Sequence, residues 1–158
     1  MELTHTLNTK RTDSSNEDFR KLIDLLDKEL RENYQEEFDF YTQYNKVDKI
    51  KNVIVVCHND DPIGCGAIKK YDSTTMEVKR MYTLPDYRGK GVASNVLNEL
   101  ELWTTELQYE NCILETGTEQ HAAMAMYQKR GYKIITNYGQ YKGVPTSICF
   151  LKTLSNSK

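Results

Sequence analysis

The sequence has no long run of apolar residues and no large excess of charge of one sign. No stretch approaches the ~20 consecutive apolar residues that a membrane-spanning helix needs. The opening residues, Met1 to His5, lack the basic and then apolar pattern of a secretory signal. The net charge is only -2 although 28% of the residues are charged, so no overall field draws the chain to nucleic acid or to a membrane surface. We therefore expect a cytoplasmic protein with a small partner, and neither nucleic acid nor a membrane among its partners.

Cysteine and histidine are few, and their spacing does not suit a metal site. None of the three histidines has the helical spacing to a second ligand that a zinc site would use. The four cysteines form no C-x-x-C pair, and each lies in or beside an apolar run, where cysteine behaves as a small hydrophobic residue. We therefore expect no metal, and we expect these four residues to pack in the core: Cys57, Cys65, Cys112 and Cys149.

The chain is also without internal repeats and linkers, and its length suits a single domain spanning 1–158. Apolar periodicity predicts alternating strands and helices. Ser14, three residues before Glu17, forms a capping-box pattern at the start of an amphipathic helix that ends near Arg31. Acidic and aromatic residues then fill a loosely patterned segment, 32–51, for which we expect a short helix within a loop. The other predicted elements are strands at 3–9, 53–57, 63–71, 76–83, 112–116, 132–136 and 147–151, and helices at 91–107 and 122–130.

The most informative segment runs from Glu77 to Ser94, and it is a strand, a Pro-containing turn, a glycine-rich loop and the start of a helix. Glycines allow a ligand to approach the backbone closely, and the N–H groups and dipole at a helix start favour an anion. Arg88 and Lys90 add positive charge. A short Gly-x-Gly at a helix start also occurs in ordinary junctions, so this pattern alone leaves an anion site and a structural junction open.

Two common phosphate-binding motifs do not fit this loop. A P-loop requires Gly-Lys-Ser/Thr at the helix start, where this chain has Gly-Val-Ala. A dinucleotide fold requires a third glycine and a position after the first strand of a parallel βαβ unit. The loop instead resembles the coenzyme A motif of GNAT acetyltransferases, Gln/Arg-x-x-Gly-x-Gly/Ala, which is matched here by Arg88, Gly91 and Ala93.

A second segment is similar to the later strand and helix of the same family. It begins with Leu114-Glu-Thr-Gly117 and continues to a helix in which Ala123 precedes Tyr127, followed by the pair Gly131-Tyr132. The resemblance covers 52–154, whereas the earlier residues match only in helical outline. It implies an α/β (α+β mixed) fold with a central, mostly antiparallel mixed sheet of about seven strands and about four helices.

The resemblance also implies a chemistry, which is direct attack of an amine on the thioester of acetyl-CoA. The exposed backbone of the strand predicted at 76–83 would pair with the pantetheine arm through Met81 and Thr83. The Met81 N–H would polarise the acetyl carbonyl. Gln120 matches a polar residue that touches the coenzyme, although a helix-start position without a ligand is equally open. The implied coenzyme-binding residues are Met81, Tyr82, Thr83, Arg88, Gly89, Lys90, Gly91, Val92, Ala93, Ser94 and Gln120.

Two residues match catalytic positions of the family. Glu77 opens the acetyl-binding strand and is the candidate base, with a solvated strand end as the alternative. Strand alternation sends Glu77 and Lys79 to the face of Met81, and it sends Arg80 the other way, toward a carboxylate partner. Tyr127 matches the tyrosine that faces the leaving thiolate, with core packing as the alternative.

The acceptor is the least constrained part of the prediction. Aromatic residues occur in the two regions that line the acceptor cleft of this family, and core or surface positions are equally open for them: Tyr34, Phe38, Tyr41, Tyr44, Tyr138 and Tyr141. The later segment resembles a bacterial subgroup with small-molecule acceptors. We therefore predict an acetyl-CoA-dependent N-acetyltransferase acting on a primary amine of a small molecule. A protein N-terminal or lysine acetyltransferase, and a catalytically silent acetyl-CoA-binding module, are the alternatives, and a homodimer is left open.

Overall fold

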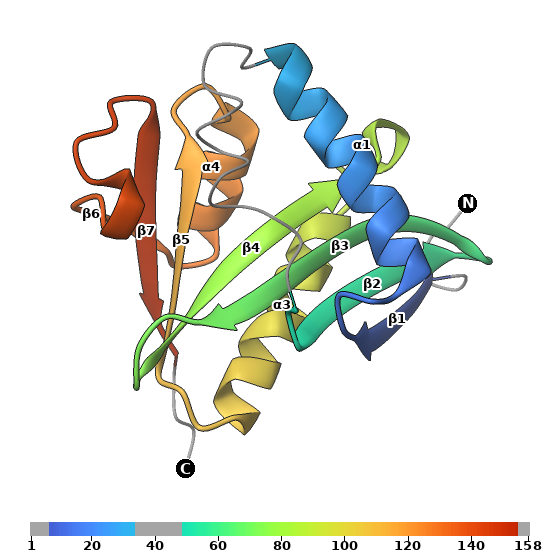
Figure 1. The fold of residues 1–158 in the computed structure, drawn as a ribbon, viewed down its shortest axis with the longest axis horizontal. Coiled ribbons are helices and arrows are strands. Elements are labelled where there is room, and N and C mark those ends of the chain that lie inside the picture. The colour runs from blue at the N-terminus through green and yellow to red at the C-terminus, as the bar shows by residue number, and fades with distance from the viewer. Residues whose placement is uncertain (1–6, 34–48, 155–158) are drawn as a thin grey trace. The chain divides into compact units, whose positions relative to one another are not determined.

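The computed structural model describes residues 7–33 and 49–154, which contain seven strands in one mixed sheet (Figure 1). The strand order is β1-β2-β3-β4-β5-β7-β6. The pairs β1/β2, β2/β3, β5/β7 and β6/β7 are antiparallel, and β4/β5 is parallel. The strands are β1 (Leu7–Thr12), β2 (Asn52–His58), β3 (Asp61–Lys70), β4 (Thr75–Thr83), β5 (Asn111–Gly117), β6 (Lys133–Ile135) and β7 (Ser147–Thr153).

Three α-helices and two short 3₁₀-helices accompany the strands in the described part of the chain. They are α1 (Glu17–Asn33), η2 (Pro85–Tyr87), α3 (Val92–Glu106), α4 (His121–Lys129) and η3 (Gly139–Tyr141). None of these helices is long and apolar enough to cross a membrane. The expected mixed sheet is confirmed, and most of the segment 32–51, where we predicted a further short helix, lies outside the described residues.

The chain divides into two compact units. Met1–Lys69 and Lys79–Leu100 form the first unit, and Lys70–Val78 and Glu101–Lys158 form the second, so β4 and α3 contribute residues to both. That the whole chain behaves as a single domain stays a prediction.

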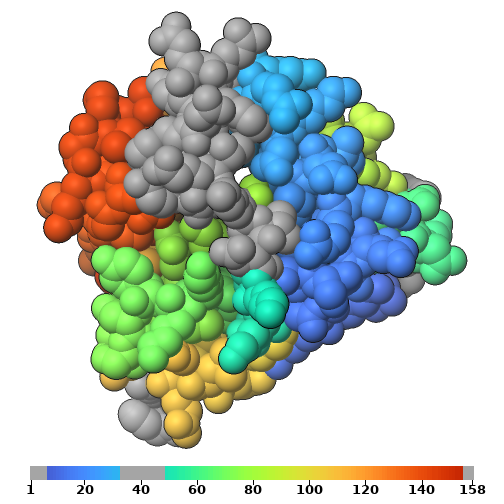
Figure 2. Space-filling view, in the orientation of Figure 1, coloured from blue at the N-terminus to red at the C-terminus, as the bar shows by residue number. Residues whose placement is uncertain are grey.

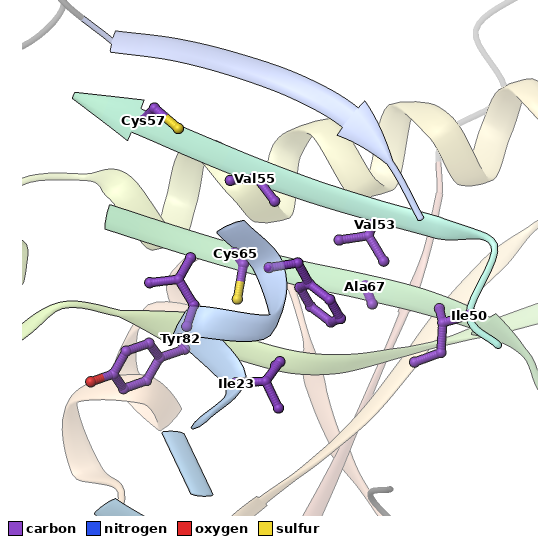
Figure 3. Packing of buried hydrophobic residues seen from close by; sticks show 10 residues of the cluster. Ile23, Ile50, Val53, Val55, Cys57, Cys65, Ala67 and Tyr82 are labelled. Carbon is purple, nitrogen blue, oxygen red and sulfur yellow. The ribbon is translucent and has the colours of Figure 1, made fainter. Parts of the chain in front are cut away.

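The core of the first unit lies between α1 and the strands. Phe19, Leu22 and Ile23 of α1 are at most 1% exposed, and burying each such side chain contributes about 1.5–3 kcal/mol. Figure 3 shows Ile23 of α1 in one cluster with strand residues that include Val53 and Cys65. The other side of α1, drawn in blue, faces the viewer in Figure 2. The amphipathic pattern of the sequence therefore corresponds to one buried and one exposed helix face.

The start of α1 differs from the predicted capping box. Asn16, rather than Ser14, caps the helix, because its Oδ1 accepts a hydrogen bond from the Phe19 N–H at 2.9 Å. The Ser14 hydroxyl oxygen instead accepts a hydrogen bond from the Ile50 N–H at 3.0 Å, and the Ser14 N–H donates to the Ile50 carbonyl. The capping prediction was wrong because a contact 36 residues away in the sequence engages the serine.

Two glycines in β3 allow α3 to pack closely against the first unit's strands. A Cβ on Gly64 would lie 2.6 Å from Val92 Cγ1, and a Cβ on Gly66 would lie 2.5 Å from Met81 Sδ and 2.8 Å from Val96 Cγ1. These distances leave no room for a side chain at either position. The close approach positions the beginning of α3, and therefore the glycine-rich loop before it, against the first half of β3.

The second unit is built on β5, β7 and β6. Its helix α4 ends at Lys129, and Gly131 follows the C-cap residue Arg130 with a φ of 98°, which fits a helix C′ position. Glu101 is only 8% exposed and accepts hydrogen bonds from Tyr132 and Lys152, both at 2.9 Å. These bonds connect the last part of α3 to β7 within this unit. The prediction that the cysteines pack in the core is confirmed, since all four are buried and free: Cys57, Cys65, Cys112 and Cys149.

Candidate active site

The glycine-rich loop, residues 88–91, has a backbone that favours glycine. Gly89 and Gly91 have φ values of 76° and 87°, in the left-handed region that residues with a Cβ rarely adopt. A Cβ at either position would meet no atom of the described residues within 4 Å. The backbone conformation, and not crowding, therefore requires glycine here, and the described residues leave the space beside both glycines open.

The first turn of α3 carries backbone donors directly after this loop. The N–H of Asn95 donates to the Gly91 carbonyl at 3.0 Å, which is the first hydrogen bond at this end of the helix. The N–H groups of Val92, Ala93 and Ser94 precede that bond and have no acceptor further back in the helix. Together with the positive end of the helix dipole, they form an arrangement suited to an anion.

Arg88 is engaged by residues of its own unit. Its Nε donates to the Thr83 carbonyl at 2.8 Å, and its Nη2 lies 2.9 Å from Glu29 Oε1 on α1. Its guanidinium also lies 5.5 Å from the centre of the Tyr82 ring. These contacts tie the start of the glycine-rich loop to the end of β4. Arg88 thus helps to shape the loop.

Sequence reasoning missed a contact that supports the same loop. The Nδ1 of His58, at the end of β2, lies 2.7 Å from the Tyr87 hydroxyl, and the two rings meet edge to face at 5.5 Å. The Nζ of Lys90 lies 5.8 Å from the centre of the Tyr87 ring. A histidine followed by a turn gave no signal for this contact, because its partner lies 29 residues further along the chain.

The end of β4 contains the residues predicted to bind the pantetheine arm. Met81 is partly exposed, whereas the side chain of Tyr82 lies in the core beneath α1 (Figure 3). Thr83 is buried and its carbonyl accepts the hydrogen bond from Arg88. Tyr82 and Thr83 could therefore serve a ligand mainly through backbone groups.

Strand β4 is irregular at Arg80, which has a φ of 60°. Its buried guanidinium pairs with Asp27 of α1 at 3.0 Å, which confirms the predicted carboxylate partner. A left-handed residue within a strand interrupts the regular alternation of side chains. The burial of the strand nevertheless alternates across this irregularity, because Glu77 and Met81 are both partly exposed whereas Arg80 is buried. That Glu77 and Met81 share a face stays a prediction.

Glu77 lies at the last position of the short ladder between β4 and β5. The ladder pairs Thr75–Glu77 with Asn111–Ile113, and Glu77 is opposite Ile113. The Tyr138 hydroxyl donates a hydrogen bond to Glu77 Oε2 at 2.7 Å. Glu77 is therefore held by another side chain of the second unit. The alternative of a solvated strand end did not include such a contact.

A second carboxylate, Glu115, belongs to the same unit and was not identified from the sequence. Its Oε2 accepts a hydrogen bond from the buried Ser147 hydroxyl at 2.6 Å. Burial, followed by the charges of Glu115 and Glu77, raises the pKa of the Tyr141 phenol. The two carboxylates therefore act on one buried tyrosine, which no motif in the sequence would have indicated.

Tyr127, the other predicted catalytic residue, lies on α4 and is only 6% exposed. Its ring centre is 5.8 Å from that of Tyr132 and 5.9 Å from that of Phe150. Burial and then the charge of Glu115 raise the pKa of the Tyr127 phenol, so the hydroxyl keeps its proton near pH 7 and is a weaker acid than an exposed tyrosine. Its hydroxyl makes no hydrogen bond to a residue that the structure describes. Packing and proton donation are therefore both compatible with its surroundings.

The predicted residues fall into two groups. The first unit holds the strand end, the glycine-rich loop and the start of α3, that is 81–83 and 88–94. The second unit holds Glu77, Tyr127 and Gln120, the last being the N-cap residue of α4 without a side-chain capping bond. Of the predicted acceptor-cleft aromatics, Tyr138 and Tyr141 are buried, and four lie outside the described residues: Tyr34, Phe38, Tyr41 and Tyr44. The described residues contain no group of three or more His, Cys, Asp or Glu that could hold a metal ion.

Known proteins resemble the chain in both sequence and fold. YsnE, an uncharacterized N-acetyltransferase of Bacillus subtilis, is 32% identical over 97 residues, which cover 60% of this chain and 64% of that protein. The chain therefore spans less than two-thirds of this relative's length. The IAA acetyltransferase of Azospirillum brasilense is 29% identical over 136 residues, covering 85% of this chain and 89% of that protein.

The fold is also found in PaiA N-acetyltransferase from Thermoplasma acidophilum, solved in complex with coenzyme A. The TM-score is 0.70 at 16% identity, over 94% of this chain and 99% of that one. Residues 19–132 match the Acetyltransferase (GNAT) family and include both the glycine-rich loop and Tyr127. Because this match covers most of the chain and agrees with the observed sheet, the chain belongs to the Acetyltransferase (GNAT) family.

Proposed function

We propose that the chain transfers the acetyl group of acetyl-CoA to a primary amine of a small molecule. The observation that carries the proposal is the backbone of the glycine-rich loop. Gly89 and Gly91 have positive φ, and they are followed directly by the first turn of α3, where the N–H groups of a helix have no acceptor within the helix. A pyrophosphate is the part of acetyl-CoA that needs such a cradle of backbone donors.

The roles of the strand residues follow from the same assignment. The backbone of Met81 and Thr83 pairs with the pantetheine arm, and the Met81 N–H polarises the acetyl carbonyl. Tyr82 contributes through its backbone, since its side chain is in the core. Gln120, at the N-cap of α4, is the remaining proposed contact with the coenzyme.

The chemical step forms a C–N bond and breaks a C–S bond. The neutral amine attacks the thioester carbonyl carbon, Glu77 takes the proton that the nitrogen loses, and the coenzyme leaves as a thiolate. Tyr127 gives its hydroxyl proton, or a hydrogen bond, to that sulfur. The raised pKa keeps this phenol protonated throughout the neutral range, and it favours the hydrogen bond over complete transfer of the proton.

The experiment is an acceptor screen with release of coenzyme thiol as its readout. Purified protein receives acetyl-CoA and one member of a panel of amines: diamines, amino acids, amino sugars, and peptides with a free N-terminus or lysine. A reaction without amine corrects for hydrolysis. The protein's own four cysteines are buried, so they add little to the thiol signal.

We expect thiol release above the amine-free rate with at least one small amine. Release with peptides alone would replace the proposed acceptor by a protein N-terminus or a lysine. Binding of acetyl-CoA without release on any amine would replace the enzyme by a silent coenzyme-binding module. No binding of acetyl-CoA at all would remove the proposal.

A further inference from the structure

We propose that Tyr138 is a positioning residue that orients the Glu77 carboxylate for proton removal from the acceptor amine. The inference rests on the proposed function, in which Glu77 is the base. It starts from one contact, the hydrogen bond of 2.7 Å from the Tyr138 hydroxyl to Glu77 Oε2. A donor fixed on one carboxylate oxygen limits rotation of the group and so sets the direction of the second oxygen.

Tyr138 can set a direction only if it is itself held in place. Its side chain is buried, with 7% exposed. The ring meets Tyr71 edge to face at 5.2 Å and Tyr141 at 5.6 Å. These contacts restrict the ring on two sides, so that the hydroxyl has a defined position in the second unit.

The backbone beside Tyr138 is fixed as well. The side-chain amide of Asn137 donates to three carbonyl oxygens of the following turn, those of Tyr141 at 3.1 Å, Val144 at 3.2 Å and Ser147 at 3.0 Å. One side chain thus closes the whole connection from β6 to β7. These hydrogen bonds hold the backbone beside Tyr138 in one conformation.

The electrostatic surroundings keep Tyr138 in the donating form. Burial, followed by the charge of Glu77 and the hydrogen bond to it, raises the pKa of the Tyr138 phenol. The hydroxyl therefore keeps its proton in the neutral range and does not compete with Glu77 for the proton of the amine.

The chain contains a similar pair that serves as a matched control. Tyr132 also donates to a glutamate, Glu101, at 2.9 Å, and both tyrosines are buried residues of the second unit. Glu101 additionally pairs with Lys152 at 2.9 Å. The Tyr132–Glu101 pair therefore joins elements of the core. The Tyr138–Glu77 pair instead contains the proposed base. Loss of the two hydroxyls should therefore affect different properties.

The experiment compares Tyr138→Phe with Tyr132→Phe, using the amine found in the acceptor screen. For Tyr138→Phe we expect kcat to fall about ten- to a hundredfold, because a displaced reacting group loses alignment. The KM for acetyl-CoA should stay within about twofold, since the hydroxyl acts in the transition state. Tyr132→Phe should lower the melting temperature and leave kcat unchanged.

A double-mutant cycle tests whether Tyr138 acts through Glu77. Glu77→Gln alone should reduce kcat strongly, and adding Tyr138→Phe to it should reduce kcat no further. An equal loss in both backgrounds would make Tyr138 a packing residue and overturn the inference. Glu77→Asp is a second test, since the shorter side chain moves the carboxylate away from Tyr138, which stays in place. Turnover of Glu77→Asp at the wild-type rate would also overturn the inference.

Failure of the inference differs from failure of the proposed function. The positioning role alone is wrong if three results occur together: the wild type acetylates an amine, Glu77→Gln turns over more slowly, and Tyr138→Phe keeps the wild-type rate. If Glu77→Gln turns over at the wild-type rate, Glu77 is not the base and the positioning role falls with it. If the wild type releases no thiol with any amine, both proposals are wrong.

Discussion

The glycine-rich loop in the first unit and the glutamate–tyrosine pairs in the second unit are built in different ways. In the loop, the groups suited to a ligand belong to the backbone, and the longest cationic side chain, Arg88, is engaged by Thr83 and Glu29. In the second unit, the groups suited to chemistry are side chains, held by hydrogen bonds such as Tyr138 to Glu77. The difference suggests that binding depends on backbone conformation, while turnover depends on individual side-chain atoms.

The largest effect should follow from a change that destroys the loop's backbone. In the wild type, acetyl-CoA at about 100 times its Kd should stabilise the fold by about 2.7 kcal/mol, which corresponds to a rise in Tm of roughly 5–10 °C. Gly91→Glu should abolish that rise in a thermal-shift assay. It introduces a Cβ at a φ of 87° and a negative charge where the pyrophosphate would bind.

Gly143→Glu is the control for Gly91→Glu. Gly143 also has a positive φ, 75°, and a Cβ there would meet no described atom within 4 Å. The control carries the same backbone strain and the same charge but lies in the second unit. Gly143→Glu should keep the rise in Tm with acetyl-CoA. If both variants lost that rise, the effect of Gly91→Glu would be general destabilisation.

The next largest effect should come from a single hydroxyl in the second unit. Tyr127→Phe removes one oxygen and almost no volume, so kcat should fall roughly ten- to a thousandfold if that hydroxyl serves the leaving thiolate. The affinity for acetyl-CoA should barely change, because the neutral thioester gains little from the donor. Wild-type turnover with an identified amine would leave Tyr127 as a packing residue beside Tyr132 and Phe150.

A smaller effect is expected when a side chain of the loop is truncated. Lys90 is exposed and lies over the Tyr87 ring at 5.8 Å. An exposed charge contributes up to about 1 kcal/mol, so Lys90→Ala should weaken acetyl-CoA binding by no more than about fivefold. Isothermal titration calorimetry measures this change. A loss as large as that of Gly91→Glu would contradict the idea that backbone donors dominate.

The smallest effect should follow from Glu29→Gln on α1. The Glu29–Arg88 pair is partly exposed on both sides, with 32% and 44% of the side chains accessible. Such pairs contribute about 0–1 kcal/mol, so the free energy of unfolding should fall by less than about 1 kcal/mol. Arg88 keeps its bond to the Thr83 carbonyl. Urea denaturation measures the stability, and a loss of several kcal/mol would show that α1 holds the loop in place.

The elements and the coenzyme motif were predictable because each rests on neighbours in the sequence. The run 53–57, the helix at 91–107 and the glycines of the loop carry their signals within a few residues. The cap of α1 was not predictable, since Ser14 and Asn16 are both good capping residues and Ile50 decides between them. The irregularity at Arg80 was also unexpected, because arginine gives no local sign of a positive φ.

The amino-acid sequence alone determined the family and the order of most strands and helices, because these depend on local spacing and on glycine. Tertiary structure alone decided which side chains meet. Tyr138 reaches Glu77 across 61 residues, and Ser147 reaches Glu115 across 32. Such contacts depend on strand pairing and on the closing of the turn by Asn137, and no residue in a local window specifies a partner that folding brings from so far away.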